Sequence, residues 1–308
     1  MPHSKLVQNG SSSLMHRVIS NAMRPMGFNK QSTAKAKAYV LKRDAKATPV
    51  VPPAKAVAGL DVSQSDERGF PIWTLRRKAG AGVPRKAIVA IHGGAYVTEI
   101  NAMTWAWNAS WARADDVDVI VPIYPLAPHG TAGRIVPIVA DLIADLVRER
   151  GADLVAVQGD SAGAGLALAA VQEVISRGVE SPARVVLISP FLDVTLSDPR
   201  SHTINDPFLS IDALREWGRQ WAGELDPADP MVSPINGSMA GIRGLAVYSG
   251  TIDLLCPDTW RLKDATEALG IDAYYDIRTG LSHGWAGFSF IPDAKSVAPI
   301  IQRQLLGR

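Results

Sequence analysis

The stretch from Leu154 to Ala167 constrains the fold more than any other, because an apolar run meets a glycine-rich turn there and an Ala/Leu-rich segment follows. The apolar run 154–157 is typical of a buried strand, and the segment after the turn is typical of a helix. The turn reads Gly159-Asp160-Ser161-Ala162-Gly163, which is G-x-S-x-G between strand and helix. This context predicts a serine on a tight, strained turn with its hydroxyl projecting from the sheet edge. An ordinary glycine-rich turn with an incidental serine is the alternative.

Apolar runs of strand length alternate with segments of helical periodicity along most of the chain. The predicted strands are 72–76, 86–91, 117–124, 154–157, 184–189, 245–249 and 272–277. The predicted helices after residue 100 are 101–114, 135–150, the segment after Gly163, 211–221, 259–269 and 293–306. Such alternation predicts an α/β fold with a mostly parallel sheet covered on both faces. Pro137 is expected in the first turn of its helix, where proline is tolerated.

The first 60 residues are expected to be helical and peripheral. Ser11-Ser12-Ser13 could cap a helix that runs to about Arg24, a second helix is expected over 30–46, and prolines between 49 and 53 mark a linker. This segment holds ten Lys and Arg but one acid, Asp44, whereas the rest of the chain holds 22 basic and 29 acidic residues. We interpret the basic segment as a solvated helical face. Attraction to anionic lipid or to an acidic substrate is the alternative.

Composition excludes several classes of protein. Apolar residues make up 47% of the 308 residues and charged residues 20%, as in a globular domain and not in a disordered chain. No apolar run approaches the roughly 18 residues of a membrane-spanning helix, and the N-terminal residues show no secretory signal pattern. A single cysteine, Cys256, excludes an internal disulfide and favours the cytoplasm. Arginine and aromatic residues are not interleaved as nucleic-acid stacking would require, so no nucleic-acid partner is expected.

A serine becomes a nucleophile only when a base accepts its proton, and the sequence offers a base and an acid in the right order. Asp253 and His283 follow Ser161 in the serine–acid–histidine order of α/β-hydrolases, each in a loop after a predicted strand. We therefore predict that Ser161 attacks, His283 acts as general base and then acid, and Asp253 orients the imidazole.

Other residues compete for these roles. Asp258 is expected in the first turn of a helix, and Asp160 is expected to point away from the reaction. His92 is the rival base, but its Gly-Gly context suits a loop that binds the oxyanion, with the imidazole holding the loop in shape. The remaining histidines lie in peripheral or irregular stretches: His3, His16, His129 and His202.

Developing negative charge on a substrate oxygen needs donors that are already in place. Gly93 and Gly94 can bring backbone N–H groups close because they lack side chains, and Ala162 supplies another N–H directly after the nucleophile. We predict these three as the oxyanion hole. A turn that merely ends a strand is the alternative. No spacing typical of a zinc site, P-loop or G-x-G-x-x-G is present, so neither a metal nor a cofactor is expected.

From about Phe70 to the C-terminus the chain resembles the hormone-sensitive-lipase-like family of α/β-hydrolase carboxylesterases. The blocks that carry the resemblance are His92-Gly93-Gly94-Ala95-Tyr96, Tyr124-Pro125-Leu126-Ala127-Pro128, Gly159 to Gly163, Ser189-Pro190-Phe191-Leu192-Asp193, Asp206-Pro207-Phe208-Leu209-Ser210, Gly250 to Asp253, and His283. The resemblance implies an α/β-hydrolase fold with a helical cap built from 1–60 and the insert 191–240. The core would then comprise 61–190 and 241–308.

The chain departs from the family pattern in three places. Ala95 replaces the third glycine of the family's HGGG, and the block after Tyr124 lacks the usual charged residues and ends in His129. Three tryptophans crowd 105–111; Trp107 and Trp111 share a helical face that could line a pocket, although core packing is the favoured interpretation.

These observations predict a cofactor-independent serine carboxylesterase that acts on short- to medium-chain acyl esters through an acyl-enzyme. An amidase, or a deacetylase of a small metabolite, would use the same chemistry. A small-molecule receptor on the same fold is a third alternative, although receptors related to this family lose a triad member and all three are present here. We expect a monomer or a homodimer, and in the latter case the predicted strand 272–277 could be an exposed edge that pairs with a second subunit.

Overall fold

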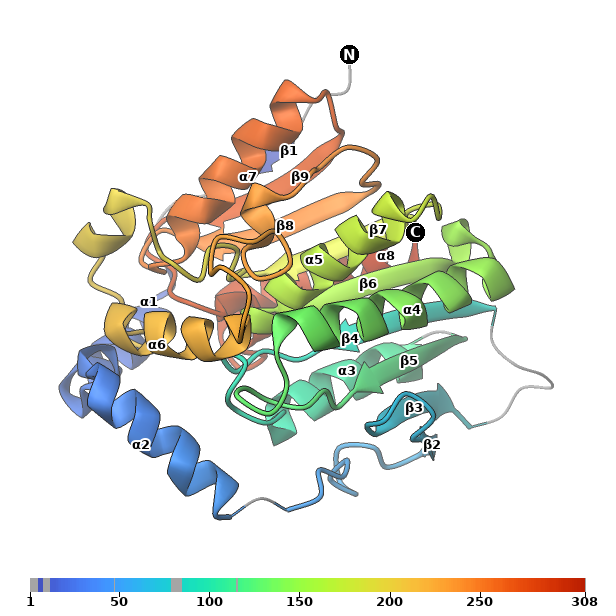
Figure 1. Ribbon diagram of the computed structural model, residues 1–308, viewed down its shortest axis with the longest axis horizontal. Helices are drawn as coiled ribbons and strands as arrows, with labels where there is room; N and C mark the ends of the chain where they lie inside the picture. The colour runs from blue at the N-terminus through green and yellow to red at the C-terminus, as the bar shows by residue number, and fades with distance from the viewer. Residues whose placement is uncertain (1–4, 8–11, 47, 79–84, 115, 308) are drawn as a thin grey trace.

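A single mixed sheet forms the centre of the molecule (Figure 1), a computed structural model that describes residues 5–7, 12–46, 48–78, 85–114 and 116–307. The part of the chain so described contributes nine strands in the order β1-β9-β8-β7-β6-β4-β5-β3-β2. The strands are β1 (Lys5–Val7), β2 (Leu60–Ser65), β3 (Ile72–Arg77), β4 (Lys86–Ile91), β5 (Val117–Pro122), β6 (Val155–Asp160), β7 (Arg184–Ile188), β8 (Leu245–Gly250) and β9 (Ala273–Arg278).

The sheet is mostly parallel, as predicted. Only β2 with β3 and β3 with β5 pair in antiparallel fashion, and the remaining neighbours are parallel. Strands β4 and β6 pair in the register Ile91 to Gly159, so the segment after β4 and the turn after β6 leave the sheet side by side. This register brings the His92-Gly93-Gly94 segment next to Ser161.

Helices cover both faces of the sheet. Along β4, Ala87, Val89 and Ile91 join the hydrophobic core on one face, whereas Ile88 and Ala90 join the core on the other. This alternation follows from the period of two along a strand, and the continuous apolar run 87–91 gives a strand that is buried on both faces. The first core is closed by α4 (Ala132–Arg150), α5 (Ala162–Ser176) and α7 (Cys256–Ala268), and the second by α3 (Ala102–Ala114) and α8 (Pro292–Leu306).

A separate group of helices lies beyond the carboxyl ends of the parallel strands (Figure 1). It consists of α1 (Leu14–Met23), α2 (Thr33–Asp44) and α6 (Ile211–Ala222), with short 3₁₀ turns at Arg24–Met26 and Phe28–Lys30. Although α2 and α6 are far apart in the sequence, the Trp217 indole N–H donates to the Ala36 carbonyl at 3.2 Å, and the Ser210 hydroxyl donates to the Gln31 carbonyl at 2.6 Å. We call α1, α2 and α6 the helical layer.

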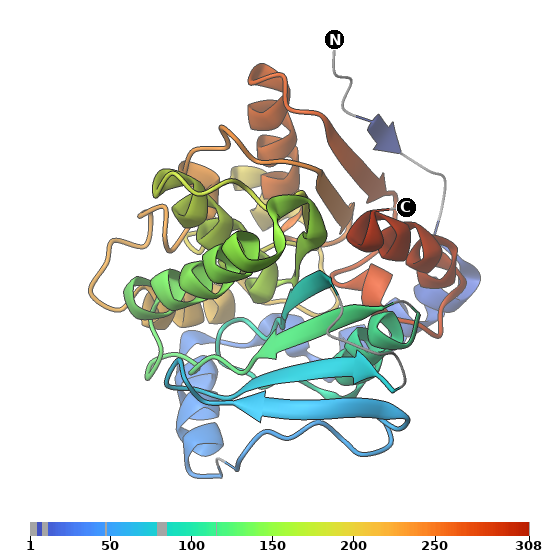
Figure 2. The same ribbon diagram turned by 90° about the vertical axis from the view of Figure 1, so that its right-hand side faces the viewer.

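Two expectations from the sequence were wrong: that strand β9 has a free edge, and that Pro137 lies in the first turn of its helix. Strand β9 is not a free edge, because β1 pairs with it in parallel over Tyr274, Tyr275 and Asp276, and Figure 2 shows β1 beside it. Pro137 lies inside α4 and not in its first turn, because the helix begins earlier, at Ala132.

Ser13 caps α1 by accepting from the His16 N–H, whereas Ser11 and His3 lie outside the described residues. Within the described part of the chain, no helix is long and apolar enough to cross a membrane.

Candidate active site

The turn at Ser161 is as tight as its sequence predicts. Ser161 lies between β6 and α5 with φ 54° and ψ −122°, a backbone conformation that non-glycine residues rarely adopt. A Cβ on Gly159 would lie 2.2 Å from the Gly163 carbonyl oxygen, and one on Gly163 would lie 2.2 Å from the Ile91 carbonyl oxygen. The two glycines therefore allow strand and helix to approach, and the strained backbone presents the Ser161 hydroxyl at the end of β6.

Ser161, His283 and Asp253 lie in one hydrogen-bonded row. His283 Nε2 is 2.9 Å from Ser161 Oγ, and His283 Nδ1 is 3.0 Å from Asp253 Oδ2. Because a carboxylate only accepts, Nδ1 carries the proton and Nε2 accepts from the serine hydroxyl. The Leu255 backbone N–H donates to Asp253 Oδ1 at 2.9 Å and fixes the carboxylate, whose side chain is fully buried. The row can pass a proton from Ser161 to an imidazole that is already oriented.

The charges around His283 favour its protonated form. Burial lowers the pKa of His283. The Asp253 carboxylate raises it through its charge and its hydrogen bond, and the charges of Asp206 and Asp160 raise it further. The net result is a His283 pKa above the ordinary value. A base with a raised pKa holds the transferred proton more firmly, and the same imidazolium can then act as the acid.

The glycine loop after β4 lies against the serine. The Gly93 N–H donates to Asp160 Oδ1 at 3.2 Å, so this N–H already has a partner. Within the described residues, the N–H groups of Gly94 and Ala162 donate no hydrogen bond to the protein. Gly94 has φ 113°, and a Cβ there would lie 2.4 Å from the Thr98 carbonyl oxygen, so this position requires glycine.

His92 lies apart from the row formed by Ser161, His283 and Asp253. Its ring stacks on Tyr124 with centroids 4.5 Å apart, its Nδ1–H donates to the Gly93 carbonyl at 2.7 Å, and its carbonyl accepts from the Tyr124 hydroxyl at 2.8 Å. Burial lowers the pKa of His92 to about 4, so the ring is neutral at physiological pH. These contacts hold the glycine loop in shape. Asp258 lies in the first turn of α7, as expected, and its carboxylate accepts from Arg261 at 2.8 Å.

Two carboxylates near the site, the half-buried Asp160 and the buried Asp206, were not predicted from the sequence. Asp160 was expected to point away, but it binds the glycine loop through Gly93, and burial raises its pKa to about 6. Asp206 accepts from the Leu254 N–H at 2.9 Å, next to Asp253, and from the Phe208 and Leu209 N–H groups at 2.7 and 3.1 Å. Burial and the nearby Asp253 raise the pKa of Asp206 to about 6. The only sequence signal for Asp206 was its place in the block that opens Asp206-Pro207-Phe208.

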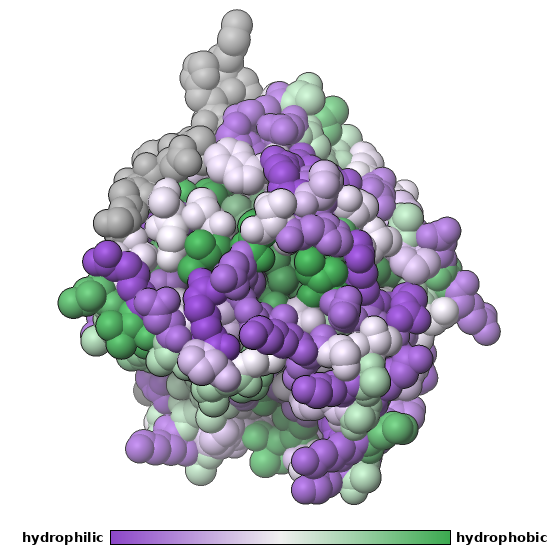
Figure 3. Space-filling view, turned by 90° about the vertical axis from the view of Figure 1, so that its left-hand side faces the viewer, coloured by the Kyte–Doolittle hydropathy of each residue, from purple (hydrophilic) through white to green (hydrophobic). Residues whose placement is uncertain are grey.

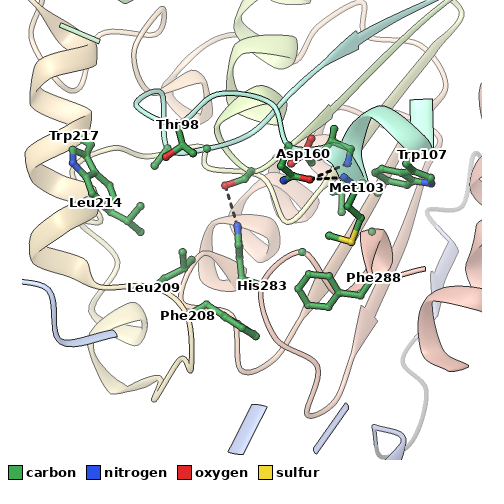
Figure 4. Close-up of a pocket in the computed structure, with 18 residues that line it drawn as sticks. Thr98, Met103, Trp107, Asp160, Phe208, Leu209, Leu214, Trp217, His283 and Phe288 are labelled. Carbon is green, nitrogen blue, oxygen red and sulfur yellow. Dashed lines mark hydrogen bonds between the residues drawn. The ribbon is translucent and has the colours of Figure 1, made fainter. Parts of the chain in front are cut away.

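A cavity of about 340 Å³ opens above Ser161 and His283. Its wall is largely apolar, and Figure 4 shows Leu209, Leu214 and Trp217 on one side of His283, with Met103, Trp107 and Phe288 on the other. The full lining is Gly94, Ala95, Thr98, Asn101, Met103, Thr104, Trp107, Asp160, Ser161, Ile188, Phe208, Leu209, Leu214, Trp217, His283, Gly284, Gly287 and Phe288. Helix α6 of the helical layer thus covers a cavity to which Ser161 and His283 are brought by the segments that follow β6 and β9. Of the three crowded tryptophans only Trp107 lines it.

A strained serine, a histidine and a buried acid on a mostly parallel sheet define a protein of the α/β-hydrolase class. Residues 88–287 match the alpha/beta hydrolase fold family, and the chain belongs to it. The chain is 36% identical to a triacylglycerol lipase of Mycobacterium tuberculosis over 199 residues, which are 64% of this chain but only 41% of that protein. It is 28% identical to an esterase of Acinetobacter venetianus over 214 residues, 68% of this chain and 70% of that protein. A solved esterase from the bacterial hormone-sensitive lipase family shares the fold, with TM-score 0.76 and 23% identity over 97% of this chain and 99% of that one.

Proposed function

We propose that the protein is a serine carboxylesterase that hydrolyses short- to medium-chain acyl esters through an acyl-enzyme. The observation that carries the proposal is the row of Ser161, His283 and Asp253 at the floor of an apolar cavity. Relatives named as an esterase and a lipase support the same reaction class. Apolar walls on both sides of His283 suit an ester with an apolar acyl group and an apolar alcohol.

In the first half of the reaction, the Ser161 oxygen attacks the ester carbonyl carbon while His283 Nε2 accepts the serine proton. The carbonyl electron pair moves to oxygen, and the N–H groups of Gly94 and Ala162 stabilise the oxyanion. Gly93 contributes by shaping the loop, because its own N–H donates to Asp160. The oxyanion then collapses, the ester C–O bond breaks, and His283 gives its proton to the leaving alcohol.

Water completes the cycle. His283 accepts a proton from a water molecule, the water oxygen attacks the acyl carbon, and collapse of the second oxyanion returns the proton to Ser161 Oγ and releases the acid. Throughout, Asp253 keeps the imidazole proton on Nδ1 and stabilises the imidazolium. In this proposal, residues 1–60 and the insert 191–240 form a cap that encloses the acyl group.

The test is hydrolysis of a p-nitrophenyl ester series from acetyl to palmitoyl by the wild-type protein and by Ser161→Ala. We expect turnover of the shorter esters and a loss of about 10⁴-fold or more in the variant, without loss of folded structure. Turnover that persists in Ser161→Ala would overturn the assignment of Ser161 as the nucleophile. Anilides of the same acids serve as the comparison, and faster cleavage of the anilides than of the esters would assign an amidase instead.

We also propose a cytoplasmic location, which the single free and buried Cys256 supports, because structural disulfides are rare in that compartment. Fractionation of cells that produce the protein is the test. Recovery of all esterase activity outside the cytoplasmic membrane would contradict the proposal.

A further inference from the structure

Helix α1 exposes a row of apolar side chains, unlike an ordinary surface helix, although its Ile19 is partly buried against the second core. Amphipathic helices of globular proteins bury the apolar stripe and expose the polar one. In α1, the polar side chains of His16 and Ser20 are buried, whereas Leu14, Met15 and Val18 are 70%, 48% and 60% exposed. Their spacing places these three apolar side chains on neighbouring turns of one face.

Polar contacts fix this orientation. The Ser282 N–H donates to His16 Nε2 at 3.2 Å, and the Ser282 hydroxyl lies 2.9 Å from the same nitrogen. The Ser13 N–H at the start of the helix donates to Asp293 Oδ1 at 3.1 Å, and Figure 2 shows α1 beside α8. The outward apolar face therefore does not result from loose attachment, because the buried face is held by hydrogen bonds to residues around the site.

Further exposed apolar side chains lie after the helix and beside the cavity. Met26, in the 3₁₀ turn after α1, is 62% exposed, and we call Leu14, Met15, Val18 and Met26 the α1 patch. Phe290, half-exposed and three residues before Asp293, stacks on Phe288 with ring centroids 5.9 Å apart, and Phe288 lines the cavity. In Figure 3, which faces the side of the helical layer, green hydrophobic residues reach the surface among purple hydrophilic ones.

The positive charge near the α1 patch favours an anionic partner. Arg17 and Lys30 are exposed and form no ion pair with any described residue, and the first 60 residues hold ten Lys and Arg against one acid. A second copy docked face to face through the patch would bring like charges together, which disfavours self-association. An anionic lipid surface suits both the apolar side chains of the patch and the positive charge around it. The exposed apolar side chains enter the acyl boundary, while the basic side chains attract the headgroups.

We propose that the α1 patch binds the surface of a membrane that contains anionic lipid. Binding through α1 places the adjoining Phe288–Phe290 segment, and with it one wall of the cavity, near the lipid. The apolar face of α1 thus serves to locate the protein on its lipid surface, whatever the molecule that enters the cavity. This inference does not depend on the proposed hydrolysis, because binding alone is measured.

The experiment is co-sedimentation of Ser161→Ala protein with vesicles, so that no lipid can be hydrolysed. Vesicles of phosphatidylcholine mixed with phosphatidylglycerol are compared with vesicles of phosphatidylcholine alone. We expect binding to the anionic vesicles that weakens as salt is added. Adding Leu14→Ser and Val18→Ser together is expected to weaken binding about tenfold or more.

Leu269→Ser, in the same Ser161→Ala background, is the matched control. Leu269 is 54% exposed but lies at the C-terminal end of α7, outside the patch, so its loss is expected to leave vesicle binding unchanged. Equal weakening by Leu269→Ser, or no weakening by the double change, would overturn the proposal. So would the absence of binding to anionic vesicles. A dimer that dissociates only in the Leu14→Ser, Val18→Ser protein, without vesicle binding, would assign the patch to a second copy instead.

Discussion

The turn that carries Ser161 and the helix α1 are attached to the molecule in opposite ways. Around Ser161, glycines let backbone approach backbone, and a Cβ on Gly163 would lie 2.2 Å from a carbonyl oxygen. Helix α1 instead makes hydrogen bonds through the His16 side chain and packs Ile19 against the second core, while Leu14, Met15 and Val18 stay exposed. The comparison teaches that the position of Ser161 depends on close backbone packing at the sheet, whereas the orientation of α1 depends on a few polar contacts.

The largest effect is expected where packing is densest. In Gly163→Ala the added Cβ would meet the Ile91 and His92 carbonyl oxygens, which cannot move without disturbing β4 and the glycine loop. We expect the free energy of unfolding to fall by about 3 kcal/mol or more, measured by urea denaturation.

Gly133→Ala in α4 is the matched control for Gly163→Ala. A Cβ there would lie 3.4 Å from Leu225 Cδ1, an ordinary contact with a flexible side chain. Its unfolding free energy is expected to stay within about 0.5 kcal/mol of wild type. A similar loss in both variants would show that the turn is no more densely packed than the surface of α4.

A smaller effect is expected at Asp206, whose carboxylate accepts from the Leu254 N–H beside the proposed catalytic acid Asp253. Asp206→Asn keeps an acceptor for the Leu254 N–H but removes a charge that raises the pKa of His283. Because His283, the proposed base, can accept a proton only when neutral, the acid limb of the kcat/KM profile is expected to move to lower pH. At neutral pH, kcat/KM is expected to fall about three- to tenfold, since the backbone contacts weaken.

Asp145→Asn serves as the control for Asp206→Asn, because Asp145 is an exposed acid that pairs with Arg68 and Arg148. Its pH profile is expected to match that of the wild type. An Asp206→Asn profile with an unmoved acid limb would mean that Asp206 acts on the backbone alone.

The sequence was sufficient for most of the sheet and for finding three side chains that lie together, because both depend on local patterns. Periodicity placed most strands, and β4 at 86–91 agrees to the residue. The order of Ser161, Asp253 and His283 located three side chains that the structure brings within hydrogen-bonding distance. These predictions needed only the tendencies of short segments and the rule that carboxyl ends of parallel strands meet at one edge.

What the sequence could not supply depends on contacts between distant segments. Strand β1 is three residues long and exists through pairing with β9, so no local periodicity marks it. The partner of Asp160 became visible only when β4 and β6 were placed side by side. The exposed apolar side chains of α1 could not be foreseen, because helical spacing does not reveal which face is buried.

A further test concerns the attachment of α2 to the glycine loop. Arg43 donates to the Val97 and Ala127 carbonyls, both at 2.9 Å, and the Tyr39 hydroxyl lies 3.0 Å from Thr98 Oγ1. Arg43→Gln is expected to lower the unfolding free energy by about 1–2 kcal/mol, because two buried acceptors lose a charged donor. The exposed neighbour in Lys42→Gln is expected to leave stability unchanged. Equal effects would show that charge, and not these two contacts, holds α2.

The smallest effect, and the one that isolates α1, is expected in His16→Gln. Burial lowers the pKa of His16, with Asp293 opposing, so the folded protein binds fewer protons at this site than the unfolded chain. His16 therefore stabilises the fold above its ordinary pKa of about 6.5, and this contribution is lost as pH falls toward the lowered pKa. The wild type is expected to exceed His16→Gln by about 1 kcal/mol in unfolding free energy at neutral pH and by less in acid. A difference that does not change with pH would mean that the imidazole fills space in the interface without accepting from the Ser282 N–H.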